Sequence, residues 1–247
     1  PLRLVGSEMC IRDRFTAFKD NDEGQASKVY ALKLPEIIDF AGEIVPIEFP
    51  DIKERFDKEL LVNTYWQSNM LLLLKRANKY FPLIEKILEE EGIPDDFKYL
   101  AVIESALENA RSPKGAKGFW QIMPNTGREY GLEVNANVDE RYHLEKSTRV
   151  ASSYLIKAKK RLGSWTLAAA SYNRGISGIS HLLKKQLADN YYDLFLNNET
   201  NRYIFRILAV KEIMSHPDRY GFVFSKEDLY RPIPLRKIGL DLSLIHI

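Results

Sequence analysis

The chain has 247 residues, of which 45% are hydrophobic and 28% are charged, and its formal net charge at pH 7 is +2. This composition is typical of a globular protein with a core of ordinary size, and the small charge excludes the strongly basic surface of a nucleic-acid-binding protein. Cys10 is the only cysteine, so an intrachain disulfide is excluded, and the four histidines show no metal-ligand spacing. We therefore expect no metal and no cofactor.

The two ends of the chain have an unusual sequence. Residues 1–14 and 242–247 resemble translated sequencing-adapter sequence, and the chain does not begin with Met. Both segments are expected to be non-native and are excluded from fold reasoning. A signal peptide or lipid anchor could have been lost with the true start, which leaves membrane association open. No apolar run reaches the roughly 20 residues that a membrane span needs.

The N-terminal part, residues 15–90, reads as a lead-in followed by a helical pre-region. Residues 34–50 contain three prolines and short apolar runs, which favour extended segments. A helical pattern then begins at Asp51 and is predicted to run to about Leu61. A second helical stretch covers about 63–88, and Pro82 predicts a break near Phe81 that divides it into two helices.

The next helix carries the most informative residue. Pro94, followed by two aspartates, is typical of a helix start, and this helix is predicted to end at about 109–111. Positions 97, 100, 101, 104 and 107 share one face, which reads Phe, Leu, Ala, Glu, Leu. Loss of hydration in such a stripe would raise the pKa of Glu104 and favour the protonated acid that glycosidic cleavage requires. The alternative is a Glu104 that faces solvent or pairs with a cation.

Further helices are predicted along the rest of the chain, and the fold class is therefore mainly α. They cover about 124–131, 144–162, 166–172, 176–189 and 200–215. Glycines or prolines follow several of them, as expected at helix ends. The stretch 166–172 is apolar on every side and should be central and buried. After Gly221, residues 222–241 read as an extended tail or linker.

Four separated motifs then point to one family. They are Glu104-Ser105, Gly-Phe-Trp-Gln-Ile-Met-Pro at 118–124, Ala-Ala-Ser-Tyr-Asn at 169–173 and Glu-Thr-Asn-Arg-Tyr at 199–203. In this order and spacing they resemble the lytic transglycosylases of bacterial cell walls, in particular their membrane-bound D type, from about residue 34 to 233. The resemblance implies a lysozyme-like multi-helix catalytic domain, here residues 91–221, with the helical pre-region packed onto it.

The resemblance also implies a mechanism. Glu104 would be the single acid/base, protonating the oxygen between N-acetylmuramic acid and N-acetylglucosamine and then accepting the proton of the muramoyl C6 hydroxyl. The product is a 1,6-anhydro sugar, and no second carboxylate is needed. The other nearby acids lie on polar stretches and are interpreted as solvated: Glu108, Glu129, Glu133, Asp139 and Glu140.

Substrate-binding roles follow from the same resemblance for six residues: Ser105, Gln121, Met123, Tyr172, Asn173 and Tyr203. Gln suits hydrogen bonding to an acetamido group, Met suits contact with a sugar face, and a Tyr hydroxyl near the acid could assist charge at the reacting centre. Structural alternatives are open for four of them. Ser105 could bond to its own helix backbone, Met123 and Tyr172 could belong to the core, and Asn173 could lie near a helix C-cap. Outside this set, Trp120 could stack on a sugar or pack in the core, and Glu199 is expected to stabilise a helix start.

Two other functions stay open at this stage. One is a goose-type lysozyme-like hydrolase that cleaves the same bond with water, and the other is a non-catalytic cell-wall binding domain. For all three functions the expected partner is the glycan strand of peptidoglycan, with no nucleic acid. The family implies a bacterial periplasm or cell envelope.

Overall fold

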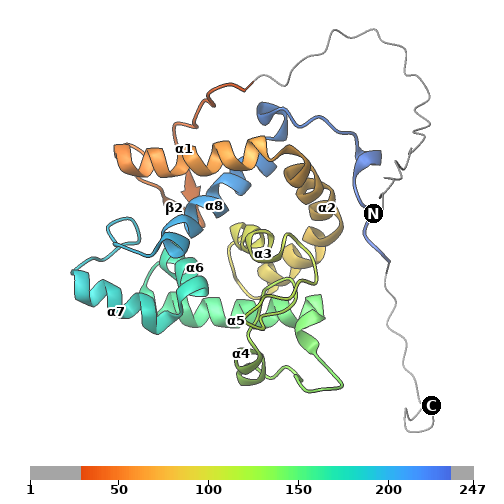
Figure 1. Cartoon of the computed structure of the whole chain (residues 1–247). Helices are drawn as coiled ribbons and strands as arrows, with labels where there is room; N and C mark the ends of the chain where they lie inside the picture. The colour runs from red at the N-terminus through yellow and green to blue at the C-terminus, as the bar shows by residue number, and fades with distance from the viewer. Residues whose placement is uncertain (1–28, 235–247) are drawn as a thin grey trace, which may run out of the picture. The chain divides into compact units, whose positions relative to one another are not determined.

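The computed structural model describes residues 29–234, of which residues 31–234 belong to one compact unit. The predicted foreign segments, most of the lead-in and the end of the tail therefore lie outside the described residues. The mainly α class is confirmed (Figure 1). The helices are α1 Pro50–Tyr65, α2 Gln67–Glu90, α3 Lys98–Ser105, α4 Pro124–Glu129, α5 Leu144–Leu162, α6 Trp165–Arg174, α7 Ile176–Gln186 and α8 Asn198–Ser215. Short 3-10 turns lie at Asp95–Phe97, Glu140–Tyr142, Pro217–Tyr220 and Lys226–Asp228.

The segment before α1 is extended, as predicted from its prolines, and it forms a small hairpin that was not predicted. Strands β1 Asp39–Phe40 and β2 Glu43–Ile44 pair antiparallel, with Phe40 opposite Glu43. The two turn residues, Ala41 and Gly42, have φ of 53° and 78°. Positive φ at both central positions matches the right-handed twist of the strands. The hairpin thereby presents Glu43 to the body of the protein.

The expected break near Phe81 is wrong, because α2 continues through Pro82 as one helix. Pro82 removes one backbone hydrogen bond. The apolar face nevertheless continues past it through buried Ile84, Ile87 and Leu88, and α2 packs on α5. Burial of this face offsets the lost bond. The chain bends instead at Trp66, between α1 and α2, where φ and ψ are −85° and 58°.

Helix α6 is the central helix, as its all-round apolar sequence predicted. Residues 166–171 are all buried, and the helix packs on α5, α7 and α8. Ser164 caps its start by accepting a hydrogen bond from the Leu167 N–H. Helix α8 in turn packs on α1, α3 and α6 (Figure 1). The two helices that carry the predicted tyrosines are therefore held from several sides.

Helix α3 is shorter than predicted and ends at Ser105 rather than near residue 110. Ala106 and Leu107 both adopt left-handed backbone conformations, with φ of 54° and 57°. Leu107 is still buried, so it satisfies the apolar pattern from outside the helix. Arg76 donates a hydrogen bond to the Ala106 carbonyl, which stabilises the abrupt end. Glu104 consequently lies on the last turn of α3. Among residues 29–234 no helix is long and apolar enough to cross a membrane.

Candidate active site

Glu104 projects from the end of α3 and is met by Tyr203 from α8. The Tyr203 hydroxyl donates a hydrogen bond to Glu104 Oε1, and Tyr203 itself is buried. Burial raises the pKa of Glu104 to about 7, against the opposing effects of the Tyr203 hydrogen bond and the positive charge of Arg206. The negative charge of Glu199 adds to the rise. The group therefore lies in the pKa range that general acid/base chemistry near neutral pH requires.

Two other carboxylates lie near this end of α3 or along the facing stretch of α8. Glu108 is exposed and forms an ion pair with Arg76, in keeping with its interpretation as a solvated residue. Glu199 does more than stabilise a helix start. It accepts a hydrogen bond of 3.0 Å from Asn173 Nδ2 and acts electrostatically on Glu104. Sequence reasoning missed this second contact because it joins residues on two different helices.

Tyr172 lies close to Glu104, but its hydroxyl is already used. It donates to the Trp120 carbonyl at 2.8 Å, while burial and the charge of Glu104 raise its pKa well above the usual value. Tyr154 packs edge-on against Tyr172 with ring centroids 5.4 Å apart. Tyr203, rather than Tyr172, thus supplies the hydroxyl that bonds the acid.

Asn173 joins the end of α6 to the start of α8. Its amide nitrogen donates to Glu199, and its amide oxygen accepts from Thr200 Oγ1 at 2.8 Å. These bonds fix the side chain in one orientation. Asn173 therefore connects the two helices that bring Tyr172 and Tyr203 to Glu104.

Gln121 and Met123 lie on the loop that leads into α4. Gln121 has a left-handed backbone, and its Nε2 donates to the carbonyls of Gly118 at 2.8 Å and Ala110 at 3.1 Å. Met123 is 43% exposed. Both residues, with Tyr172, line a cavity of about 200 Å³. An apolar cavity edged by an amide is suited to a sugar ring with an acetamido group.

The presence of glycine at position 118 of this loop has a steric explanation. A Cβ at Gly118 would lie 2.0 Å from the Arg141 carbonyl oxygen, and the residue has a φ of +80°. Arg141 is buried and donates to the carbonyls of Gly115 and Ile122 at 2.8 and 3.0 Å. Close approach of two backbones fixes the loop next to the cavity.

Asp139 is not the solvated residue that its polar surroundings suggested. It accepts hydrogen bonds of 2.8 Å from both Nε and Nη2 of Arg141, and its carboxylate pairs with Lys117 at 2.9 Å. These partners hold the pKa of Asp139 far below its usual range. The acid orients Arg141, and through it the loop, because a two-pronged contact fixes a guanidinium in one plane.

Ser105 and Trp120, whose roles were left open, both make structural contacts. Ser105 is buried and donates to the Ala101 carbonyl at 3.2 Å, which is the helix-bonding alternative. Trp120 is fully buried, and its indole nitrogen donates to Thr148 Oγ1 at 2.9 Å. A buried indole cannot stack on a sugar, so Trp120 contributes through packing and through the carbonyl that holds Tyr172.

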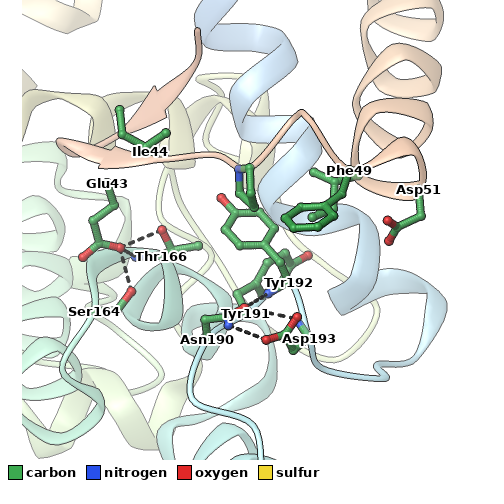
Figure 2. A pocket seen from close by; sticks show the side chains of 12 residues that line it. Glu43, Ile44, Phe49, Asp51, Ser164, Thr166, Asn190, Tyr191, Tyr192 and Asp193 are labelled. Carbon is green, nitrogen blue, oxygen red and sulfur yellow. Dashed lines mark hydrogen bonds between the residues drawn. The ribbon is translucent and has the colours of Figure 1, made fainter.

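Glu43 of the hairpin anchors α6 from its other end, and sequence reasoning missed it. Figure 2 shows its carboxylate directed at Ser164 and Thr166. It accepts from both hydroxyls, at 2.6 and 2.8 Å, and from the backbone N–H groups of Trp165 and Thr166 at 2.6 and 2.9 Å. Burial raises the pKa of Glu43, but these hydrogen bonds outweigh it and lower the value to about 2. A pocket of about 510 Å³ adjoins this contact and does not include Glu104.

Together, the helical architecture and a single half-buried acid between two tyrosine-bearing helices define a lysozyme-like domain. Residues 82–195 match the family described as Transglycosylase SLT domain. These residues therefore carry the sequence pattern of a transglycosylase SLT domain. The match includes the predicted site residues except Tyr203, which follows it.

The chain is similar to characterised relatives. It is 31% identical over 191 residues to the membrane-bound lytic murein transglycosylase D of Escherichia coli (strain K12), covering 74% of this chain and 41% of the relative. The protein of a second Escherichia coli strain gives the same figures. The chain thus spans about two-fifths of the length of these relatives. The solved 70 kDa soluble lytic transglycosylase of Escherichia coli superposes with a TM-score of 0.50 at 18% identity, over 72% of this chain and 33% of that one, and shares the fold.

Proposed function

We propose that the chain is a peptidoglycan lytic transglycosylase in which Glu104 alone serves as acid and base. The neutral acid gives its proton to the bridging oxygen, the bond from that oxygen to muramoyl C1 breaks, and the leaving sugar departs as an alcohol. The C6 hydroxyl oxygen then bonds to C1, and its proton passes to the Glu104 carboxylate. The acid is regenerated, a 1,6-anhydro ring forms, and no water is consumed.

One observation carries this proposal: a carboxyl whose pKa is raised to about 7 and whose charged form is stabilised by the Tyr203 hydroxyl. A single group can work in both steps only if neither of its protonation states is strongly favoured. Gln121, Met123 and Asn173 are proposed to bind the sugars around the bond, and Tyr172 to shape the site. Ser105 is proposed to stabilise the helix end that carries the acid.

The hydrolase remains the second candidate because Glu199 supplies a negative charge near Glu104. A hydrolase would need such a group to activate water. Glu199 is exposed and bonded to Asn173, which suits a role in holding Asn173. Glu199→Gln keeps that hydrogen-bond acceptor, so a transglycosylase should retain most of its activity. A loss comparable with that of Glu104→Gln would favour hydrolysis.

The deciding experiment is mass spectrometry of the sugars that the protein releases from purified peptidoglycan. Products ending in 1,6-anhydromuramic acid, absent with Glu104→Gln, are expected. Reducing-end products would establish a hydrolase. Retention of the protein on insoluble wall without any product would establish a binding domain. We further propose the bacterial periplasm or envelope as the place of action, because the substrate lies there.

A further inference from the structure

Helix α8 presents three side chains along the face that meets Glu104. Glu199, Tyr203 and Arg206 are spaced four and three residues apart, so they lie on one stripe of the helix. Tyr203 bonds Glu104, and both charged residues act electrostatically on it. Arg206 therefore lies one turn beyond the tyrosine, near enough for its charge to lower the pKa of Glu104.

Arg206 differs from the other basic residues of α8 in having no partner among residues 29–234. Arg202 donates to buried Glu59 at 2.5 and 3.1 Å, and Lys211 pairs with Asp39 and Asp96 at 3.3 and 2.7 Å. No hydrogen bond or ion pair joins Arg206 to any described side chain or carbonyl. Arg206 is thus a partly buried basic residue whose charge no described group neutralises through a direct contact.

The guanidinium is also open to a ligand. Arg206 is half-buried, yet none of its nitrogens is among the buried polar atoms that lack a partner in residues 29–234, so each of them reaches solvent. Glu104 cannot neutralise it when protonated, which is the state needed for the first step. In that state Arg206 is a positive charge that no described carboxylate contacts directly.

We propose that Arg206 binds a carboxylate carried by the substituent of the muramoyl sugar, and so selects the strand that enters the site. This inference rests on the proposed substrate. The sugar rings themselves are uncharged, so the anions available next to the scissile bond belong to that substituent. They are a carboxylate of the attached peptide, or the lactyl carboxylate of a strand from which the peptide has been removed. A guanidinium fork matches either one in a two-pronged contact.

The test compares Arg206→Gln with Arg161→Gln, which removes the same charge from an exposed position on α5. Three soluble substrates are needed: peptide-bearing strands, peptide-free strands, and peptide-bearing strands whose carboxyls have been converted to amides. Arg206→Gln is expected to raise KM about tenfold, with a smaller change in kcat, only where the bound carboxylate is present. The unmodified substrate that loses affinity identifies the source of the carboxylate. Arg206→Lys should restore part of the loss, since it keeps the charge without the fork.

A different pattern would overturn the proposal. If Arg206 acts only on Glu104, Arg206→Gln changes kcat and the pH profile equally for amidated and unmodified strands. Equal KM values for all variants and strands would overturn it as well. Binding of the same strands to Glu104→Gln, with and without Arg206→Gln, separates the two proposals. If the unaltered chain cleaves nothing but strand binding still depends on Arg206, the proposed activity is wrong and the proposed carboxylate site is retained.

Discussion

At the scale of the residue, the pair formed by Tyr203 and Glu104 should control the pH dependence of cleavage. The first step needs the neutral acid, so activity should fall as pH rises past about 7, the pKa of Glu104. Groups that face the carboxyl are Tyr203, Arg206 and Glu199 from α8 and Tyr172 from α6. Of these, Tyr203 is the one that bonds it directly.

Tyr203→Phe should therefore raise the pKa of Glu104 and move the alkaline limb of the pH profile upward. The hydroxyl stabilises the charged form, and its loss should also lower kcat by roughly 10- to 100-fold, as for other hydrogen bonds to charged groups. Measuring kcat/KM against pH on soluble glycan strands tests both effects. Tyr99→Phe, on the same helix as Glu104 and bonded to Ser215, is the control. An alkaline limb that does not move in Tyr203→Phe would contradict the assignment of this hydroxyl.

At the scale of the element, Gly118 fixes the loop that carries Gln121 and Met123. Gly118→Ala places a methyl group 2.0 Å from the Arg141 carbonyl oxygen and adds strain at a φ of +80°. Gly115→Ala is a matched control, since its φ is +87° and its Cβ would meet nothing within 4 Å.

Gly115→Ala should cost about 1 kcal/mol of unfolding free energy from backbone strain alone, and Gly118→Ala should cost at least about 3 kcal/mol. Urea denaturation measures both, and the cleavage assay should show a selective loss in Gly118→Ala. Equal losses of unfolding free energy in the two variants would mean that the backbone at Gly118 can move away from Arg141 at little energetic cost.

The contact between the hairpin and α6 should make the unfolding free energy of the protein depend on pH in the acidic range. The folded-state pKa of Glu43 is about 2, below its ordinary value of 4.5. Its contribution to stability is therefore present above pH 4.5 and is lost as pH falls toward 2. Glu43→Ala should lower the unfolding free energy by about 2 kcal/mol at pH 7, because it removes several hydrogen bonds to one carboxylate.

The difference between Glu43→Ala and the unaltered chain should narrow at pH 3. Glu48→Ala, an exposed acid beyond the same hairpin, should change stability by less than about 0.5 kcal/mol. Chemical denaturation at the two pH values provides the comparison. If the difference in unfolding free energy between Glu43→Ala and the unaltered chain does not change with pH, the role of the ionised carboxylate is contradicted.

At the scale of the whole molecule, the pre-region holds the helix that carries Tyr203. Helix α1 packs its buried Phe56 and Leu60 toward the core, and α1 lies along α8. Glu59 on α1 is buried against Arg202, and Arg55 lies 4.4 Å from the centre of the Phe205 ring. Both of these contacts flank Tyr203 in sequence.

A fragment of residues 91–234, which keeps the predicted catalytic domain (91–221) but lacks the pre-region, should therefore not fold cooperatively. Without the pre-region, α8 would expose apolar surface, Arg202 would lose its partner Glu59, and Lys211 would lose Asp39 and keep only Asp96. A fragment of residues 31–234 should fold. Circular dichroism during thermal unfolding distinguishes the two. A sharp transition in the shorter fragment would show that the predicted boundary at residue 90 is also a folding boundary.

Much of the helical fold and of the candidate site could be predicted from local sequence signals. The helix at 144–162 was placed correctly because Gly163 ends it, and the buried helix around residue 170 because it is apolar on every side. Residues from three separate helices and a loop were assigned to one site by their motifs. Contacts at long sequence separation could not be predicted. The anchor of Glu43 and the bond from Tyr172 to Trp120 each depend on how distant segments meet in space, as does the pairing of Asp139 with Lys117.

Pro82 and the end of α3 show the same limit in local structure. Proline disfavours a helix interior, yet packing along the apolar face of α2 outweighs that preference. Ala106 and Leu107 carry no glycine signal, yet both adopt left-handed backbone conformations next to Glu104. Strain at such positions is tolerated where surrounding contacts fix the backbone.

The fluorescence of buried Trp120 could report on the occupancy of the cavity next to Tyr172. Of the three tryptophans, Trp66 is 59% exposed and Trp165 lies against Phe97, whereas the Trp120 carbonyl holds the hydroxyl of Tyr172. With Trp66 and Trp165 replaced by Phe, the remaining emission would come from an indole whose ring centroid lies 6.5 Å from that of Tyr172, a residue that lines the cavity. Displacement of Tyr172 by an entering sugar would change that emission, so occupancy could be followed in real time with unlabelled glycan, even in a variant that cleaves nothing.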